Sequence, residues 1–220
     1  MKLLNTIAIA SLSVLGTLNA AQVDLGITLG SVLGAGNTVL SDARVELGTF
    51  SGYSDTSGNV NSAFFTGKDY STLRASYTSL LVAGSNPLTT DSTGGIYTSI
   101  DLASTAVNTR LFAWIHSTST ASSSANWVLI TGGANPSGAL AEAYNPMWLA
   151  VAPNASDLNV IEAATIYTQI VASSPGASLI ANTTLDPDGA NIALVPEPST
   201  GALMMIGAAG LVALRRLRKV

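Results

Sequence analysis

The single histidine of the chain, His116, is the first residue to test for chemistry, because a serine nucleophile needs a histidine base. A serine hydrolase would set its nucleophile on a sharp Gly-x-Ser-x-Gly turn and place an acid behind the histidine. In this sequence His116 ends the apolar stretch RLFAWIH, which begins at Arg110, and a serine-rich run follows it. We therefore predict an ordinary residue at a strand end, and with one histidine and no cysteine we predict no zinc site.

Paired carboxylates are the second chemistry to test, since glycoside hydrolysis needs two of them at a defined separation. Glu46, Glu142 and Glu162 lie in or near apolar stretches, but nothing in the sequence brings two of them together. We favour a solvated strand face or loop for all three. A polysaccharide hydrolase or lyase is the less favoured enzyme alternative, and it would need convergent acids in a cleft.

Two polar loops contain part of a calcium-binding pattern. Residues 185–191 (LDPDGAN) place polar side chains around Gly189, and residues 54–61 (SDTSGNVN) form a similar series. The polar residues are Asp186, Asp188 and Asn191 in the first loop and Asp55, Ser57, Asn59 and Asn61 in the second. Neither loop completes the pattern with its distal bidentate glutamate, so we predict turns. We assign no catalytic residue, no metal ligand and no cofactor.

Three tryptophans offer indole faces that can stack on sugar rings: Trp114, Trp127 and Trp148. Each lies inside an apolar run (FAWI, NWVLI and MWLAV), where packing in the core is the ordinary fate of a tryptophan. We predict core positions for them. A carbohydrate-binding module for exopolysaccharide is the alternative function, and it predicts binding that depends on an exposed tryptophan.

Charge is distributed unevenly along the chain. Of the 9 Lys and Arg residues, four lie between Gln22 and Val195, against twelve of the 13 acids, so this segment carries 4 − 12 = −8. Such a segment should repel nucleic acid and anionic lipid, so we predict no nucleic-acid partner. The chain has no cysteine, so its stability must come from a hydrophobic core, and about 170 residues are enough for one such domain.

Short β-branched and aromatic runs between turn residues predict strands. Residues 44–50 (RVELGTF) and 95–102 (GIYTSIDL) alternate with the two-residue period of a half-buried strand. Further candidates are residues 79–83, 110–116, 127–131, 147–152 and 164–171. Residues 71–83 and 156–168 are the places where a helical turn or two is expected. This spacing predicts an all-β fold, an antiparallel, jelly-roll-like β-sandwich over residues 22–194.

The N-terminus has the order of a secretory signal peptide: Lys2, an apolar run from Leu3 to Leu18, and small residues at Ala20 and Ala21. We predict a signal peptide over residues 1–21 with cleavage after Ala20 or Ala21. The segment that follows would then be exported by the secretion pathway.

The C-terminal segment, residues 195–220, has three parts. Two prolines, Pro196 and Pro198, precede an uncharged run of 14 residues from Gly201 to Leu214. A basic cluster then closes the chain: Arg215, Arg216, Arg218 and Lys219. The run predicts a single hydrophobic helix of about 21 Å, short of the roughly 30 Å of a bilayer core. The cluster predicts a cytoplasmic C-terminus and a body on the far side of the membrane.

This order of motif, apolar segment and arginine cluster resembles the PEP-CTERM sorting signal of Gram-negative bacteria. The motif residues are Val195, Pro196, Glu197, Pro198 and Ser199. The resemblance implies that a membrane-embedded exosortase recognises the Pro-Glu-Pro stretch and removes the hydrophobic tail. It also implies a surface or extracellular protein associated with exopolysaccharide or biofilm, anchored transiently in the inner membrane. A permanent single-span anchor is the alternative for the tail.

These observations together predict a non-enzymatic, exported cell-surface or matrix protein, structural or adhesive in exopolysaccharide. The exosortase is its processing partner, the membrane is a transient one, and exopolysaccharide is a candidate ligand.

Overall fold

A computed structural model describes residues 22–27, 30–54, 60–80, 88–102, 105, 107–133, 148–150, 160–162, 168–181 and 190–194. Its strands are β1 (Gln22–Gly26), β2 (Val32–Leu33), β3 (Arg44–Phe50), β4 (Tyr77–Ser79), β5 (Leu88–Thr89), β6 (Tyr97–Asp101), β7 (Phe112–His116), β8 (Trp127–Gly132), β9 (Val160–Glu162), β10 (Thr168–Ser173), β11 (Ala177–Ala181) and β12 (Ala190–Leu194). Helical segments are α1 (Tyr70–Ser76) and the 3-10 turns η1 (Ala35–Asn37) and η2 (Ser62–Phe64).

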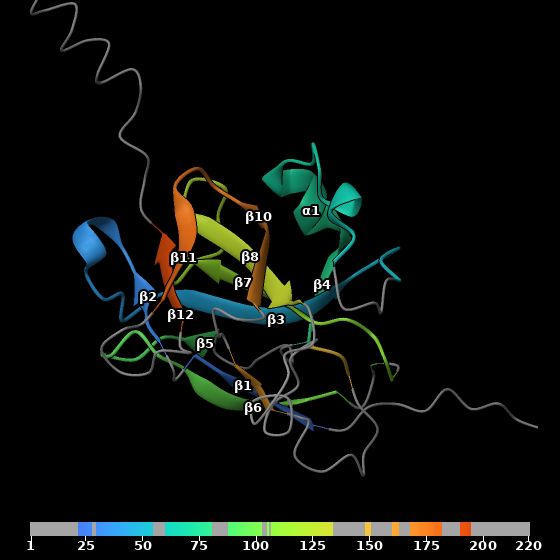
Figure 1. The fold of residues 1–220 in the computed structure, drawn as a ribbon, viewed down its shortest axis with the longest axis horizontal. Helices are drawn as coiled ribbons and strands as arrows, with labels where there is room; N and C mark the ends of the chain where they lie inside the picture. The colour runs from blue at the N-terminus through green and yellow to red at the C-terminus, as the bar shows by residue number, and fades with distance from the viewer. Residues whose placement is uncertain are drawn as a thin grey trace, which may run out of the picture.

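Three sheets organise these strands (Figure 1). The largest runs in the order β10-β8-β7-β3-β4, with β5 also paired to β3, and all of its pairings are antiparallel. The others are β6-β1-β9 and β11-β12-β2. Each of these combines one antiparallel pair with one short parallel pair, β1–β9 and β12–β2. The prediction of an all-β fold is confirmed, with parallel pairs that the sequence did not indicate.

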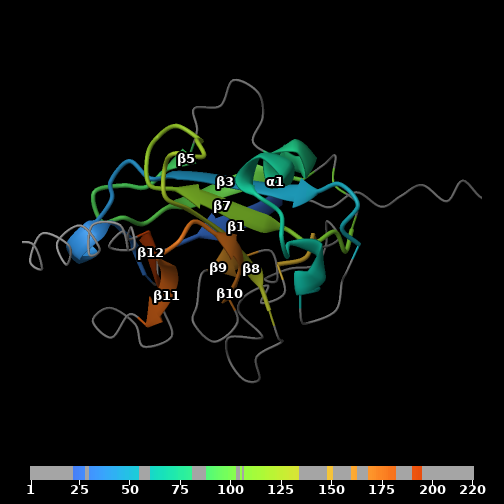
Figure 2. The same cartoon turned by 90° about the horizontal axis from the view of Figure 1, so that it is seen from above.

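The largest sheet is buried on both faces. One face carries Val45, Leu47 and Ile115, which pack in one cluster with residues of β1, β6 and β12. The opposite face is aromatic and is covered by α1 and η2. Figures 1 and 2 show this arrangement, with α1 on one side of β3 and β1 on the other. Strand β3 is therefore buried on both sides, whereas its alternating sequence predicts burial on one.

Several predicted strands lie where the sequence places them. Residues 44–50 form β3, and β6, β7 and β8 lie within or overlap 95–102, 110–116 and 127–131. In and beside β6 the alternation places Ile96, Thr98, Ile100 and Leu102 on one face. Ile96, Ile100 and Leu102 are 8%, 5% and 0% exposed and Thr98 is half-buried, whereas Tyr97 on the other face is 60% exposed. The two-residue period therefore identified the buried face correctly.

Other segments differ from their predicted form. Around 79–83 the described strand is Tyr77–Ser79, because α1 ends at Ser76 directly before it. Residues 148–150 form an isolated bridge between Leu149 and Arg110 in place of the strand expected at 147–152. The described part of 156–168 is strand β9 together with the first residue of β10, so the helical turn expected there is wrong for those residues.

Helix α1 is short and is held at both ends. The side chain of Asp69 caps its N-terminus by accepting a hydrogen bond from the Thr72 N–H at 2.8 Å, and Leu73 is its buried anchor. Tyr77, which follows the helix, passes directly over Gly48 of β3. A Cβ atom at Gly48 would lie 2.4 Å from the Thr78 carbonyl oxygen and 2.5 Å from the Tyr77 ring, so only glycine fits there.

Both predicted terminal segments lie outside the described residues: the signal peptide at 1–21, and the sorting signal at 195–220 with its hydrophobic helix. Within the residues that the structure describes, no helix is long and apolar enough to cross a membrane.

Candidate functional site

The predicted sorting signal, residues 195–220, begins directly after the last described strand. Strand β12 is the middle strand of its sheet, with β11 on one side and β2 on the other. Its last residues, Ile192, Ala193 and Leu194, are at most 1% exposed. The Leu194 carbonyl accepts a hydrogen bond from the side-chain amide of Asn126 at 3.1 Å. The chain is thus fixed in the core up to Leu194, directly before the predicted recognition residues 195–199.

A buried ion cluster lies on the aromatic face of the largest sheet. Glu46, in the middle of β3, has a fully buried side chain. The Arg44 Nε donates to its Oε1 at 2.5 Å, and the Arg74 guanidinium donates to both carboxylate oxygens at 2.6 and 3.2 Å. Arg44 and Glu46 share a strand face because they are two residues apart. Arg74 comes from the last turn of α1.

This arrangement corrects the prediction of a solvated Glu46. Burial alone would raise the pKa of the carboxyl, but the hydrogen bonds and charges of Arg74 and Arg44 outweigh it and hold the pKa below its usual range. A general acid in glycoside hydrolysis needs the opposite, a raised pKa. Glu46 is therefore an ionised structural group that ties β3 to α1.

His116 lies beside this cluster at the end of β7, and its side chain is fully buried. Its Nε2 is 3.1 Å from the Tyr70 hydroxyl, and its ring stacks on Trp114 with centroids 5.7 Å apart. Burial lowers the pKa of His116 to about 4, so the imidazole is neutral near pH 7. The strand-end position predicted for it is confirmed. The hydrogen-bond partner of its Nε2 is a tyrosine from α1, which matches none of the roles in a serine-histidine-acid site.

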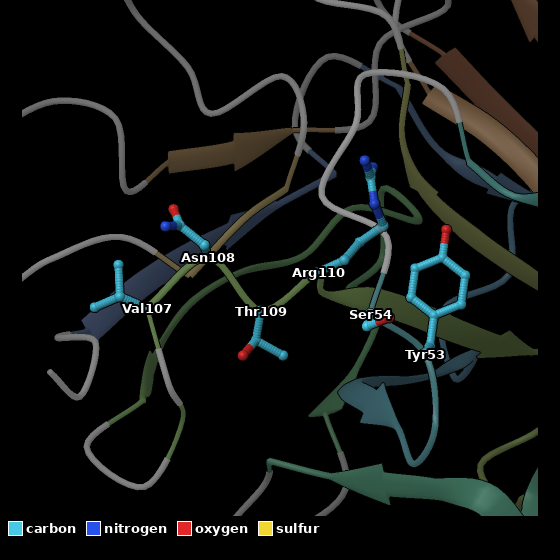
Figure 3. A pocket seen from close by; sticks show the side chains of 6 residues that line it. All are labelled: Tyr53, Ser54, Val107, Asn108, Thr109 and Arg110. Atoms are coloured by element: carbon cyan, nitrogen blue, oxygen red, sulfur yellow. The ribbon is translucent and has the colours of Figure 1, made fainter. Parts of the chain in front are cut away.

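A pocket of about 270 Å³ lies between two loop segments, Tyr53–Ser54 and Val107–Arg110 (Figure 3). Figure 3 shows the Arg110 and Tyr53 side chains near one another on one side, with Val107 and Asn108 on the other. The Arg110 guanidinium donates to the Gly132 carbonyl at 2.7 Å, so it supports the end of β8. The volume is just below the roughly 300–1,000 Å³ of common small-molecule sites.

The tryptophan prediction is confirmed, since Trp114, Trp127 and Trp148 are 0%, 7% and 0% exposed. None of them can therefore serve as the exposed platform on which the carbohydrate-binding alternative depended. Among the described residues, Tyr97 on β6 is the exposed large aromatic residue.

The remaining candidates have structural roles or fall outside the described residues. The Asn61 side chain caps η2, and the Asn191 side chain accepts a hydrogen bond from the Ser31 N–H at 3.1 Å. Glu162 belongs to β9 by its backbone. Outside the described residues lie Asp55, Ser57, Asn59, Glu142, Asp186, Asp188 and Gly189. Among described side chains, no group of three or more His, Asp or Glu is placed to hold a metal ion.

Sequence reasoning did not find the cluster of Arg44, Glu46 and Arg74. One signal was available, because an arginine and a glutamate two residues apart in a strand point to the same face. The missing information was the third partner, Arg74, which lies 28 positions away from Glu46 and reaches it only through the docking of α1.

Comparison with known proteins identifies the C-terminal segment. A family model described as the PEP-CTERM protein-sorting motif matches residues 194–219, which confirms the predicted resemblance for that segment. No curated protein and no solved structure matches the chain. The motif implies that the chain is exported and sorted by an exosortase.

Proposed function

We propose that this chain is a cell-surface or extracellular-matrix protein, structural or adhesive in exopolysaccharide, and released from its membrane tail by an exosortase. The observation that carries the proposal is the sorting motif at residues 194–219. The proposal includes a signal peptide over residues 1–21, a sandwich-like body over 22–194 and a sorting signal over 195–220. In support, β1 begins at Gln22 and β12 ends at Leu194.

The recognition residues have the physical properties that processing needs. Pro196 and Pro198 fix their φ angles and disfavour helix at the residues before them, so the motif stays extended for an enzyme to bind. The apolar run 201–214 places it at the membrane face, and the basic cluster at 215–219 keeps the end of the chain in the cytoplasm. The body then reaches the cell surface or the medium after cleavage.

We propose a non-enzymatic role for the body. The two residues most suited to acid-base chemistry among those described, Glu46 and His116, are engaged in packing and ion pairing. Glu46 stays ionised between two arginines, and His116 stays neutral beneath α1. Both states favour a stable core over proton transfer at a reacting atom.

The test is the double substitution Glu197→Ala, Pro198→Ala in an exosortase-bearing host. Loss of the extended recognition element should leave the precursor in the membrane fraction and lower the released mature form at least about tenfold, in keeping with transition-state interactions of a few kcal/mol. Immunoblotting of fractions and mass spectrometry of the released C-terminus measure both forms.

A matched control is Pro187→Ala, Asp188→Ala, which removes the same residue classes outside the motif. This control should be released like the wild type. Normal release of the motif variant would contradict exosortase sorting.

A second candidate function, carbohydrate binding, is favoured by one surface observation. Tyr97 is 60% exposed on β6, an edge strand of the β6-β1-β9 sheet. The Asp24 carboxylate accepts hydrogen bonds from the hydroxyls of Tyr97 at 3.2 Å and Ser99 at 2.5 Å. An aromatic ring beside a carboxylate and a hydroxyl suits a sugar ring, which has an apolar face and polar edges.

Tyr97→Ala tests this candidate by affinity electrophoresis in gels that contain exopolysaccharide purified from the host. If the ring stacks on sugars, the substitution should weaken retention several-fold, because stacking supplies much of such binding. Val39→Ala removes another large exposed apolar side chain, 46% exposed, and should leave retention unchanged. Equal retention of wild type and Tyr97→Ala would exclude this surface as the binding site.

A further inference from the structure

The connection between the folded body and the predicted membrane segment is short. Leu194 is fixed in β12, and the apolar run begins at Gly201, so six residues (195–200) and seven Cα-to-Cα steps separate the core from the membrane segment. A chain extends at most about 3.3–3.6 Å per residue, so they span at most about 25 Å. Before cleavage, the end of the body from which β12 exits must therefore lie within about 25 Å of the membrane.

Two turns surround that exit, and we call them together the exit surface: residues 117–126, which connect β7 to β8, and residues 174–176, which connect β10 to β11. Asn126 donates to the Leu194 carbonyl at 3.1 Å. Ala177, the partner of Leu194 in the antiparallel register, directly follows the second turn. Ser174 joins the two turns through backbone and hydroxyl hydrogen bonds to Trp127 at 2.9 Å.

The exit surface is uncharged in a segment that is otherwise acidic. Residues 117–126 (STSTASSSAN) and 174–176 (SPG) hold no charged side chain, while the segment from Gln22 to Val195 carries −8. A neutral surface can approach a membrane enzyme and its anionic lipid surroundings without the repulsion that an acidic surface meets.

We propose that the exit surface is the face of the body that contacts the exosortase during processing. The inference rests on the proposed function and extends it from the sorting motif to a part of the folded body. The partner is the membrane-embedded enzyme itself, because the short connection keeps the exit surface within about 25 Å of the membrane in which that enzyme lies. The contact is polar and short-lived, formed by serine and threonine hydroxyls, and it ends when the tail is removed.

The absence of cysteine from the chain makes the proposal testable by site-specific cross-linking. Ser123→Cys places a thiol on the exposed part of the exit surface, and Ser51→Cys places one on an exposed serine beyond the far end of β3. The first residue of β3, Arg44, bonds through its N–H to Thr118 of the exit surface at 3.2 Å. Seven residues of strand place Ser51 about 20 Å or more from that point.

Each full-length variant is expressed with the exosortase and labelled with a thiol-specific photo-cross-linker, and the adduct with exosortase is quantified with the released mature form. We expect Ser123→Cys to give several-fold more adduct than Ser51→Cys. Processing with equal adducts, or with more adduct at Ser51→Cys, overturns this inference and leaves the proposed function standing. If neither variant nor the wild type is processed, the proposed function fails and this inference fails with it.

Discussion

Replacement of Glu46 by alanine is expected to lower the free energy of unfolding by about 3–5 kcal/mol. The carboxylate is fully buried and accepts hydrogen bonds from two guanidinium groups, one on β3 and one on α1. Its removal leaves two cations beside an aromatic core with no compensating charge. Arg44 and Arg74 are 24% and 35% exposed at their side chains, which lets water relieve part of the penalty and favours the lower end of this range.

Urea unfolding of the purified protein, followed by tryptophan fluorescence, measures this change. Glu46→Gln keeps the shape and one acceptor, so it should cost less than Glu46→Ala and remain measurable if the alanine variant fails to fold. Asp42→Ala removes an exposed acid from the turn before β3 and should change stability by less than about 0.5 kcal/mol. A cost for Glu46→Ala equal to that of Asp42→Ala would contradict the structural role of the cluster.

Acidification is expected to destabilise the protein through His116 before the carboxylates protonate. The unfolded chain protonates this residue near its ordinary pKa of 6.5, whereas burial lowers the folded value to about 4. Between these values the unfolded state binds more protons, so stability present above pH 6.5 is lost as the pH falls toward 4. The loss is about 2 kcal/mol by pH 5, since each unit of pKa shift corresponds to about 1.4 kcal/mol.

Unfolding free energies of the wild type and His116→Gln at pH 7.5 and pH 5 isolate this contribution. Glutamine does not titrate, so only the wild type loses this stability on acidification. The free energy of unfolding of His116→Gln relative to the wild type should therefore rise by about 2 kcal/mol between pH 7.5 and pH 5. Glu46 titrates in another window, because its lowered pKa removes stability only as the pH falls below about 4.5. A pH-independent difference between the two proteins would show that His116 is solvated in the folded state.

The periodicity of the sequence predicted several strands of the body, but it did not predict that their outer faces would also be buried. In β3 the alternation of Val45 and Leu47 identified the buried side correctly, but Glu46, Gly48 and Phe50 also lie beneath other residues. These residues are covered because Leu73 and Arg74 of α1, and Tyr77 directly after the helix, pack over this face of the sheet. Local sequence carries no signal for which element will cover a strand, since that depends on contacts between residues far apart in the chain.

The sequence by itself identified the sorting motif near the C-terminus and predicted a leader at the N-terminus. A leader, a Pro-Glu-Pro motif and a basic terminus are defined by local composition and order, so their prediction needs no tertiary contact. Only the tertiary structure decided three further features. They are the placement of Glu46 between Arg44 and Arg74, the burial of His116, and the hydrogen bond from Asn126 to the Leu194 carbonyl. Each of these depends on desolvation and on pairing across strands, and a residue's neighbours in sequence determine neither.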